Sequence, residues 1–172
     1  RGLCQLNNST ETWIDGLNGK QCYCVEKSNI RIYVGTTDGV YSFRDDENES
    51  AELIGLQGNA VRLLTSFGNS LWAGTETQLF YSVGGGPFNE FANITLGQDE
   101  YIKQLKTYEN ALNVLTNKHL FAIVDGETQK VFTWTESVAN NSKVVFAQNL
   151  DRDKVLFQIG NELCLLSGNG AV

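Results

Sequence analysis

The side chains that could carry out chemistry are few in this 172-residue chain, and they are scattered along it. The chain contains a single histidine, His119, and four cysteines. A serine–histidine–aspartate mechanism would need His119 as its general base. However, His119 occupies a turn position where the other copies of a repeat, described below, carry Gly39, Gln78 or Glu162. We therefore do not expect triad chemistry, and the sequence favours a protein that is not an enzyme.

Paired carboxylates offer a second route to catalysis. A carbohydrate-active enzyme needs two of them about 5–9 Å apart on either side of the sugar. The acidic clusters Asp45-Asp46-Glu47 and Asp99-Glu100 consist of adjacent residues, a pattern typical of solvated loops. Carboxylates that are distant in sequence can still meet in a folded chain. A carbohydrate-active enzyme is therefore the alternative to a binding protein.

The cysteines are candidates for disulfides or for core thiols. Cys22 and Cys24 are two residues apart on one predicted strand, so we expect both on the same face of that strand. A direct bridge between them would be strained, which leaves core thiols or one bond to Cys4. A tetrahedral zinc site would need two more ligands, so we expect no metal and no cofactor.

Several features favour an oxidising compartment. An even number of cysteines suits disulfide formation. Sequons for N-glycosylation begin at five positions: Asn7, Asn8, Asn48, Asn93 and Asn140. The chain begins at Arg1 and has no methionine, which predicts a trimmed piece of a longer protein. We expect an extracellular or secretory glycoprotein, or a periplasmic protein if the source is bacterial.

Composition and charge narrow the class of partner. The net charge is -7, whereas nucleic-acid binding and anionic membrane surfaces call for basic residues. We therefore expect no nucleic-acid partner. No run of 18 apolar residues is present in the sequence, so we expect no insertion into a membrane. The hydrophobic fraction of 41% predicts a packed globular chain.

These residues must be positioned by a sequence repeat of about 40 residues that occurs four times. Each repeat contains a pair of segments rich in strand-forming residues. The four pairs are 32–36 with 40–43, 71–75 with 79–82, 112–116 with 120–123, and 155–159 with 163–166. Alternating segments precede the pairs at 21–25, 60–64, 101–105 and 142–146, and variable strands follow at 51–56, 88–95 and 130–135. A fixed period made of short strands is typical of a propeller blade, and we find no helix.

We therefore predict an all-β protein: a β-propeller with four blades of four antiparallel strands, forming a single module over residues 1–172. The blades lie at about 21–56, 60–95, 101–135 and 142–167. The fourth copy lacks its own outer strand, and residues 11–14 look like an orphan outer strand. Either these residues complete a closed four-bladed ring, locked by a Cys4–Cys164 bridge, or the chain is a fragment of a larger propeller.

The stretch from Asp15 to Phe43 resembles the two-component-regulator propeller repeat of extracytoplasmic sensor regions in bacterial hybrid histidine kinases. The matching residues are Asp15-Gly16-Leu17, Tyr33-Val34-Gly35-Thr36 and Asp38-Gly39-Val40-Tyr41. Residues 71–75 match the same phrase in the second copy. The resemblance implies ligand sensing or partner docking, with no catalytic residues to carry across.

In a propeller, the connections between blades and those from second to third strands gather on one face. On that face we place eight residues: Asp15, Asn18, Asp38, Glu76, Asp99, Glu100, Lys118 and Asn161. They could bind a sugar or a cation through carboxylates and amides, or could simply be turn residues. We expect Trp13, Trp72 and Trp134 to pack in the core or between blades.

We therefore predict a non-enzymatic binding or structural module, whose partner is a protein, a glycan or neighbouring copies in an assembly. The ligand-sensing ectodomain of a receptor is a further alternative.

Overall fold

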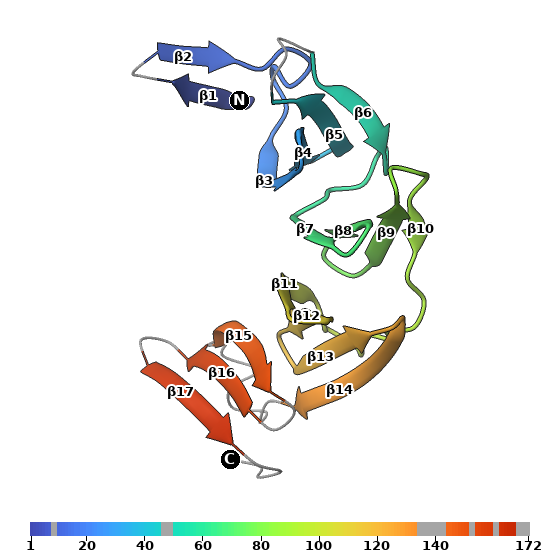
Figure 1. Cartoon of the computed structure of the whole chain (residues 1–172), viewed down its shortest axis with the longest axis vertical. Helices are drawn as coiled ribbons and strands as arrows, with labels where there is room; N and C mark the ends of the chain where they lie inside the picture. Colours follow the sequence, from blue (N-terminus) through green and yellow to red (C-terminus); the bar gives the residue numbers. More distant parts are fainter. Residues whose placement is uncertain (8–9, 46–49, 134–143, 152–153, 160–161, 168–172) are drawn as a thin grey trace. The chain divides into compact units, whose positions relative to one another are not determined.

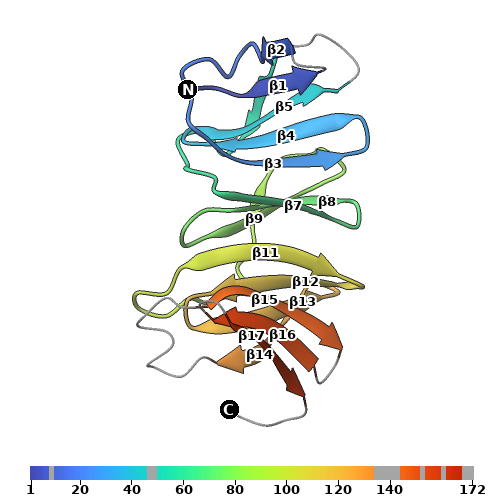
Figure 2. The same ribbon diagram turned by 90° about the vertical axis from the view of Figure 1, so that its left-hand side faces the viewer.

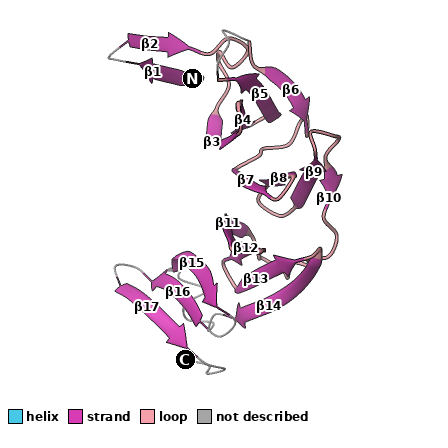
Figure 3. Cartoon of the chain, viewed as in Figure 1, coloured by secondary structure: helices cyan, strands magenta, loops and turns pink. Residues whose placement is uncertain are grey.

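The computed structural model describes the chain except for residues 8–9, 46–49, 134–143, 152–153, 160–161 and 168–172 (Figure 1). In the described residues every regular element is a β-strand, as predicted (Figure 3). None of these residues forms a helix long and apolar enough to cross a membrane. The chain divides into two compact units, Arg1–Phe91 and Ala92–Val172, and each is described by itself.

The first unit contains two four-stranded antiparallel sheets whose strands follow the order of the chain. The first sheet consists of β3 (Cys22–Ser28), β4 (Arg31–Thr36), β5 (Gly39–Arg44) and β6 (Glu52–Gly55). The second sheet consists of β7 (Leu63–Phe67), β8 (Ser70–Gly74), β9 (Leu79–Val83) and β10 (Asn89–Glu90). The strands of these sheets lie within residues 22–55 and 63–90, and where an outer strand is predicted at 88–95 the structure has only the two residues of β10.

The first unit begins with a separate hairpin of β1 (Cys4–Asn7) and β2 (Thr10–Trp13). Cys4 pairs with Trp13 and Asn7 with Thr10. The strand predicted at residues 11–14 is therefore present, but it is not an orphan, because β1 is its partner. Its assignment as the outer strand of the fourth copy stays a prediction.

The second unit contains the two remaining copies of the repeat. The third sheet has four strands: β11 (Ile102–Tyr108), β12 (Ala111–Thr116), β13 (His119–Val124) and β14 (Glu127–Thr133). The fourth sheet has three described strands: β15 (Val144–Asp151), β16 (Lys154–Ile159) and β17 (Glu162–Ser167). The described part of the fourth copy ends with β17, and its predicted lack of an outer strand stays a prediction.

Two apolar clusters build the core of the first unit, one on each side of the first sheet. One cluster joins the N-terminal segment to this sheet and contains Ile14, Leu17 and Val34. The other lies between the first and second sheets and contains Val40 and Val61, both with no exposed surface. Figure 2 shows the strands of these two sheets as successive layers. Alternation along the strands thus places apolar residues on both sides of the first sheet.

In the Gly-Thr pair of the first copy, Gly35 and Thr36 each have a structural role. A Cβ atom on Gly35 would lie 2.6 Å from the carbonyl oxygen of Val61, so this position requires glycine. The close approach allows the N–H of Val61 to donate to the carbonyl oxygen of Thr36 at 2.9 Å. The hydroxyl of Thr36 donates to the carbonyl oxygen of Gly39 and accepts from the N–H of Asp38. The pair therefore closes one turn and joins two sheets.

Two of the sequence predictions are wrong. Cys22 and Cys24 do not share a face, because a β-bulge interrupts the register between them. Cys22 packs against the N-terminal cluster and Cys24 against the cluster between the sheets. Trp13 is 53% exposed rather than packed in the core, whereas Trp72 is buried as predicted and contacts Tyr81. Trp134 lies outside the described residues.

Candidate functional site

Asp38, one of the residues predicted to line one face, contacts neighbouring segments of the first unit. Lys20, which precedes β3, lies 3.5 Å from the carboxylate of Asp38 in the turn between β4 and β5. Asp38 also accepts from the backbone N–H of Gly58 at 3.1 Å. A hydrogen bond with the Tyr41 hydroxyl is the main reason why the pKa of Lys20 is raised. Asp38 therefore ties three segments of the chain together.

The other predicted residues of the first unit are more exposed. Arg62 and Glu76 form an ion pair of 4.0 Å with both side chains more than half exposed. Such a pair contributes little to stability. Asp15 and Asn18 are exposed residues of the segment between β2 and β3. Both could contact a partner, and a binding role for them stays a prediction.

In the second unit the corresponding residues form a buried cluster around Glu100. Its side chain is 1% exposed and its Oε1 atom lies 2.7 Å from Nδ1 of His119. The hydroxyl of Thr116 donates to the same oxygen at 2.5 Å, and the N–H of Gly97 donates to Oε2 at 2.8 Å. On the other side of the ring, His119 Nε2 lies 3.3 Å from the Lys130 ammonium. The cluster joins the segment before β11 to the turn between β12 and β13.

The charge of Glu100 is stabilised by these partners. Burial by itself raises the pKa of the carboxyl, but hydrogen bonds from Thr116, Gly97 and His119 outweigh it, and the pKa falls below 4.5. The remaining residues of the segment support the same arrangement. Asn117 donates from Nδ2 to the carbonyl oxygen of Asp99 at 2.9 Å. Lys118 bonds the carbonyl oxygen of Gln98.

Three of the eight predicted residues, Asp38, Glu76 and Glu100, have a common structural role. In each of the first three sheets they join the segment entering the sheet to the turn between its second and third strands. Asn161 lies outside the described residues. Among the described residues no group of three or more His, Cys, Asp or Glu side chains could hold a metal ion. Sugar or cation binding at these residues stays a prediction.

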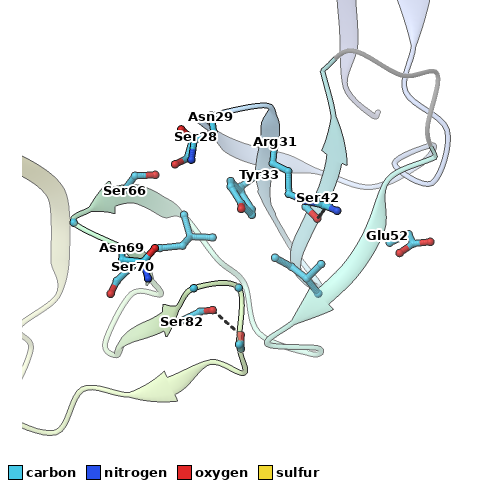
Figure 4. A pocket seen from close by; sticks show the side chains of 16 residues that line it. Ser28, Asn29, Arg31, Tyr33, Ser42, Glu52, Ser66, Asn69, Ser70 and Ser82 are labelled. Carbon is cyan, nitrogen blue, oxygen red and sulfur yellow. Dashed lines mark hydrogen bonds between the residues drawn. The ribbon is translucent and has the colours of Figure 1, made fainter.

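A polar pocket of about 530 Å³ lies at the opposite ends of the strands, between the first and second sheets. Its walls come from β3 to β6 on one side and β7 to β9 on the other, with the glycine loop 84–86 at its edge (Figure 4). The polar side chains lining it are Ser28, Asn29, Arg31, Tyr33, Ser42, Glu52, Ser66, Asn69, Ser70 and Ser82. Hydroxyl and amide groups thus dominate the surface of the pocket.

Few of these groups are fully used by contacts within the protein. Arg31 donates to the hydroxyl of Ser42 at 3.2 Å, and Ser82 donates to the carbonyl oxygen of Gly86 at 2.6 Å. The hydroxyl oxygen of Ser66 is buried and has no hydrogen-bond partner among the described residues. Figure 4 shows the Ser66 side chain pointing toward Tyr33. A buried hydroxyl without a partner is costly unless water or a ligand satisfies it.

Sequence reasoning missed this pocket. The available signal was the small polar residues inside otherwise apolar third strands, since Ser42 and Ser82 are each only 3% exposed. The Gly84-Gly85-Gly86 run was a second signal, because glycines leave open space beside the second sheet. Neither signal shows that the two sheets leave room between them. That depends on the spacing of the sheets rather than on any single strand.

The cysteines and sequons are placed as follows. Cys4, Cys22 and Cys24 are free thiols, and burial raises the pKa of Cys24 to about 11, so it stays protonated at neutral pH. The side chain of Cys164 lies outside the described residues, so its pairing stays a prediction.

Asn93 is exposed and donates from Nδ2 to the carbonyl oxygen of Gly126. Asn7 is the last residue of β1. Asn8, Asn48 and Asn140 are not among the described residues, and glycosylation stays a prediction at all five positions.

Comparisons with protein-family models and with curated proteins find no match. Solved structures do match. The extracellular domain of the one-component system protein BT4673 from B. thetaiotaomicron is 19% identical, with a TM-score of 0.73 over 98% of this chain. A streptogramin B lyase is 13% identical, with a TM-score of 0.66 over 97% of this chain and 62% of that one. The computationally designed Ika4 protein is 14% identical, with a TM-score of 0.63 over 90% of this chain and 96% of that one.

These similarities show the fold. The chain is a β-propeller module with a four-blade-like arrangement of repeated antiparallel sheets, as the sequence predicts. It spans 25% of the length of the BT4673 chain that it matches. Closure of the sheets into a four-bladed ring stays a prediction.

Proposed function

We propose that this chain is a non-enzymatic, extracytoplasmic propeller module that binds a carbohydrate in the pocket between its first and second sheets. The observation that carries the proposal is the pocket itself, a 530 Å³ space lined by five serines, two asparagines, Arg31, Tyr33 and Glu52. Ligand pockets are usually lined by apolar groups with a few polar ones, and this pocket reverses that balance. Its ligand therefore carries many hydrogen-bonding groups.

The chemistry of a sugar matches these groups. Serine hydroxyls and asparagine amides both donate and accept, as sugar hydroxyls do. Tyr33 adds an apolar ring with a polar end, and Arg31 adds a rigid set of donors. The buried hydroxyl of Ser66 has no hydrogen-bond partner within the described residues, so a ligand or an ordered water molecule could bond to it.

A sensing role in a larger receptor is a second candidate. It is favoured by the extracellular domain of BT4673, which belongs to a one-component system and shares the fold. Exposure of Asn93 and the acidic net charge of -7 are compatible with an extracytoplasmic location. In that role the sugar-binding pocket would report ligand to the rest of the receptor.

Calorimetric titration with a panel of neutral and acidic mono- and oligosaccharides tests the binding function. The double variant R31A/N69A removes two exposed polar side chains that line the pocket. We expect it to weaken binding by tenfold or more, because each lost hydrogen bond to a charged or amide group costs about 1 kcal/mol.

The matched control is N18A/E76A, which removes two exposed polar side chains from the opposite ends of the strands. It should bind like the original chain. Equal weakening by both pairs, or no saccharide binding by the original chain, would contradict the proposal. Release of shorter sugars during incubation would instead favour the carbohydrate-active enzyme.

A further inference from the structure

The polar pocket of the first unit is lined by two charged side chains, which lie on different strands of the first sheet. Arg31 belongs to β4 and Glu52 to β6, with β5 between them. Hydrogen-bonded strands are roughly 5 Å apart, so about 10 Å separates these two strands. Neither residue forms an ion pair with a residue that the structure describes. The wall of the pocket therefore has a positive side and a negative side.

The guanidinium of Arg31 has hydrogen-bond donors that the protein does not use. A guanidinium carries several N–H donors in one plane. Among the described residues Arg31 donates only to the hydroxyl of Ser42, at 3.2 Å. Figure 4 shows Arg31 beside Tyr33 and Ser42. Because the Arg31 side chain is also exposed, a ligand can reach it. The planar fork of a guanidinium fits both oxygens of a carboxylate.

A second arginine lies directly opposite Arg31 in the first sheet. Arg44 of β5 is the register partner of Arg31, so both side chains start on the same face. Like charges in this arrangement are destabilising, and a bound anion would offset their repulsion. Glu26 lies on the same face as the partner of Tyr33, but its carboxylate accepts from the N–H of Ser66 at 2.8 Å. The pairing of the arginines thus favours an anionic group at Arg31.

The neighbouring residues place a sugar ring next to this group. Tyr33 pairs with Ser42 and Ser42 with Glu52, which makes one row across the sheet. The row faces the second sheet, because Tyr33 packs against the apolar cluster between the two sheets. Arg31 and Tyr33 are two residues apart on one strand face, a spacing of roughly 7 Å. An acid group on a sugar ring in contact with Tyr33 could therefore reach Arg31.

We propose that the ligand of this pocket is an acidic saccharide, a uronic acid whose carboxylate binds Arg31 and whose hydroxyls bind Ser42 and Glu52. This inference rests on the proposed function, since it names the class of sugar for the same pocket. A carboxylate such as that of Glu52 accepts hydrogen bonds from sugar hydroxyls but repels a second acid group. The ligand therefore carries its charge on the side of Arg31 and its hydroxyls on the side of Glu52.

Calorimetric titration with matched sugars tests this inference. The probes are the methyl glycosides of glucuronic acid and galacturonic acid, their methyl esters, and the methyl glycosides of glucose and galactose. Esterification removes the charge and keeps the ring. We expect at least one acid to bind tenfold or more tightly than its ester and its neutral sugar, because hydrogen bonds between charged groups are the stronger ones. In the variant Arg31→Gln the acid and its ester should bind equally.

The variant Arg62→Gln is the matched control, because Arg62 is an exposed arginine that pairs with Glu76 outside the pocket. It should keep the preference for the acid. An ester that binds as tightly as its acid, or a preference that survives Arg31→Gln, would overturn this inference and leave the pocket a site for neutral sugars. Tighter binding of the 6-sulfates of glucose or galactose would overturn the choice of a carboxylate. Absence of binding by every sugar would contradict the proposed function as well.

Discussion

At the scale of single residues, the most consequential arrangement is the buried carboxylate of Glu100. Its oxygens accept hydrogen bonds from Thr116, His119 and the N–H of Gly97. Few buried charges are tolerated without such partners. This cluster joins two segments of the third sheet, as the only partly buried Lys20–Asp38 pair does in the first. The difference in burial predicts that Glu100 matters most for stability.

The variant Glu100→Gln should therefore lower the free energy of unfolding by about 1.5–3 kcal/mol at neutral pH, because it removes charged hydrogen bonds. The pKa of Glu100 is lowered in the folded protein, so unfolding at acid pH takes up a proton. Its contribution is thus complete above about pH 4.5 and is lost as the pH falls through the lowered folded-state value. Urea denaturation across pH 2–7 measures both effects.

Glu76→Gln is the control, because Glu76 is exposed and its pair with Arg62 is weak. It should change the free energy of unfolding by less than about 0.5 kcal/mol. A Glu100→Gln variant as stable as the original chain at pH 7, with the same loss of stability in acid, would contradict the role assigned to this carboxylate.

Residue-scale features were only partly predictable from the sequence. Glu100 and Asp38 were identified as residues of one face, but their partners His119 and Lys20 depend on the path of segments that the repeat does not specify. The bulge between Cys22 and Cys24 was missed, because period-two alternation assumes an unbroken ladder. The exposure of Trp13 was missed because its strand belongs to a terminal hairpin, which has fewer neighbours than a central strand.

At the scale of elements, a threonine at the end of the second strand helps to form the same turn in the first three copies of the repeat, although the residues around it differ. Glycine before it becomes Leu115 in the third copy, yet Thr36, Thr75 and Thr116 each bond the backbone of the following turn. The positions of the strands were predictable from the alternation of apolar and polar residues. The length of β10 was not, because the Pro87 and glycine residues before it leave few residues for pairing.

The variant Thr36→Val should lower the free energy of unfolding by about 1–3 kcal/mol. Valine keeps the shape of threonine but leaves the N–H of Asp38 and the carbonyl oxygen of Gly39 without their partner at a position that has no exposed surface. Thr37→Val, in the same turn but exposed, should change it by less than about 0.5 kcal/mol. Equal effects of the two changes in urea denaturation would contradict this account of the turn.

At the scale of the whole molecule, the period of the repeat was enough to predict the all-β propeller fold. It was not enough to place the pocket, since the pocket forms where polar residues at one end of two neighbouring sheets meet, and neither sequence segment shows that meeting alone. In the sequence, acidic residues collect at one end of the predicted strands and indicate a site there. The structure instead has its pocket at the opposite ends, among serines and glycines. Small residues carry little sequence signal, although they determine where space remains.

The most direct test of the central claim is amide hydrogen exchange measured by mass spectrometry, with and without a saturating saccharide. Binding in the pocket should slow exchange in residues 28–33, 66–70 and 82–86, which line it, and leave exchange unchanged in residues 36–39 and 75–78 at the other ends of the strands. Slower exchange at the second set alone, or at neither set, would contradict it.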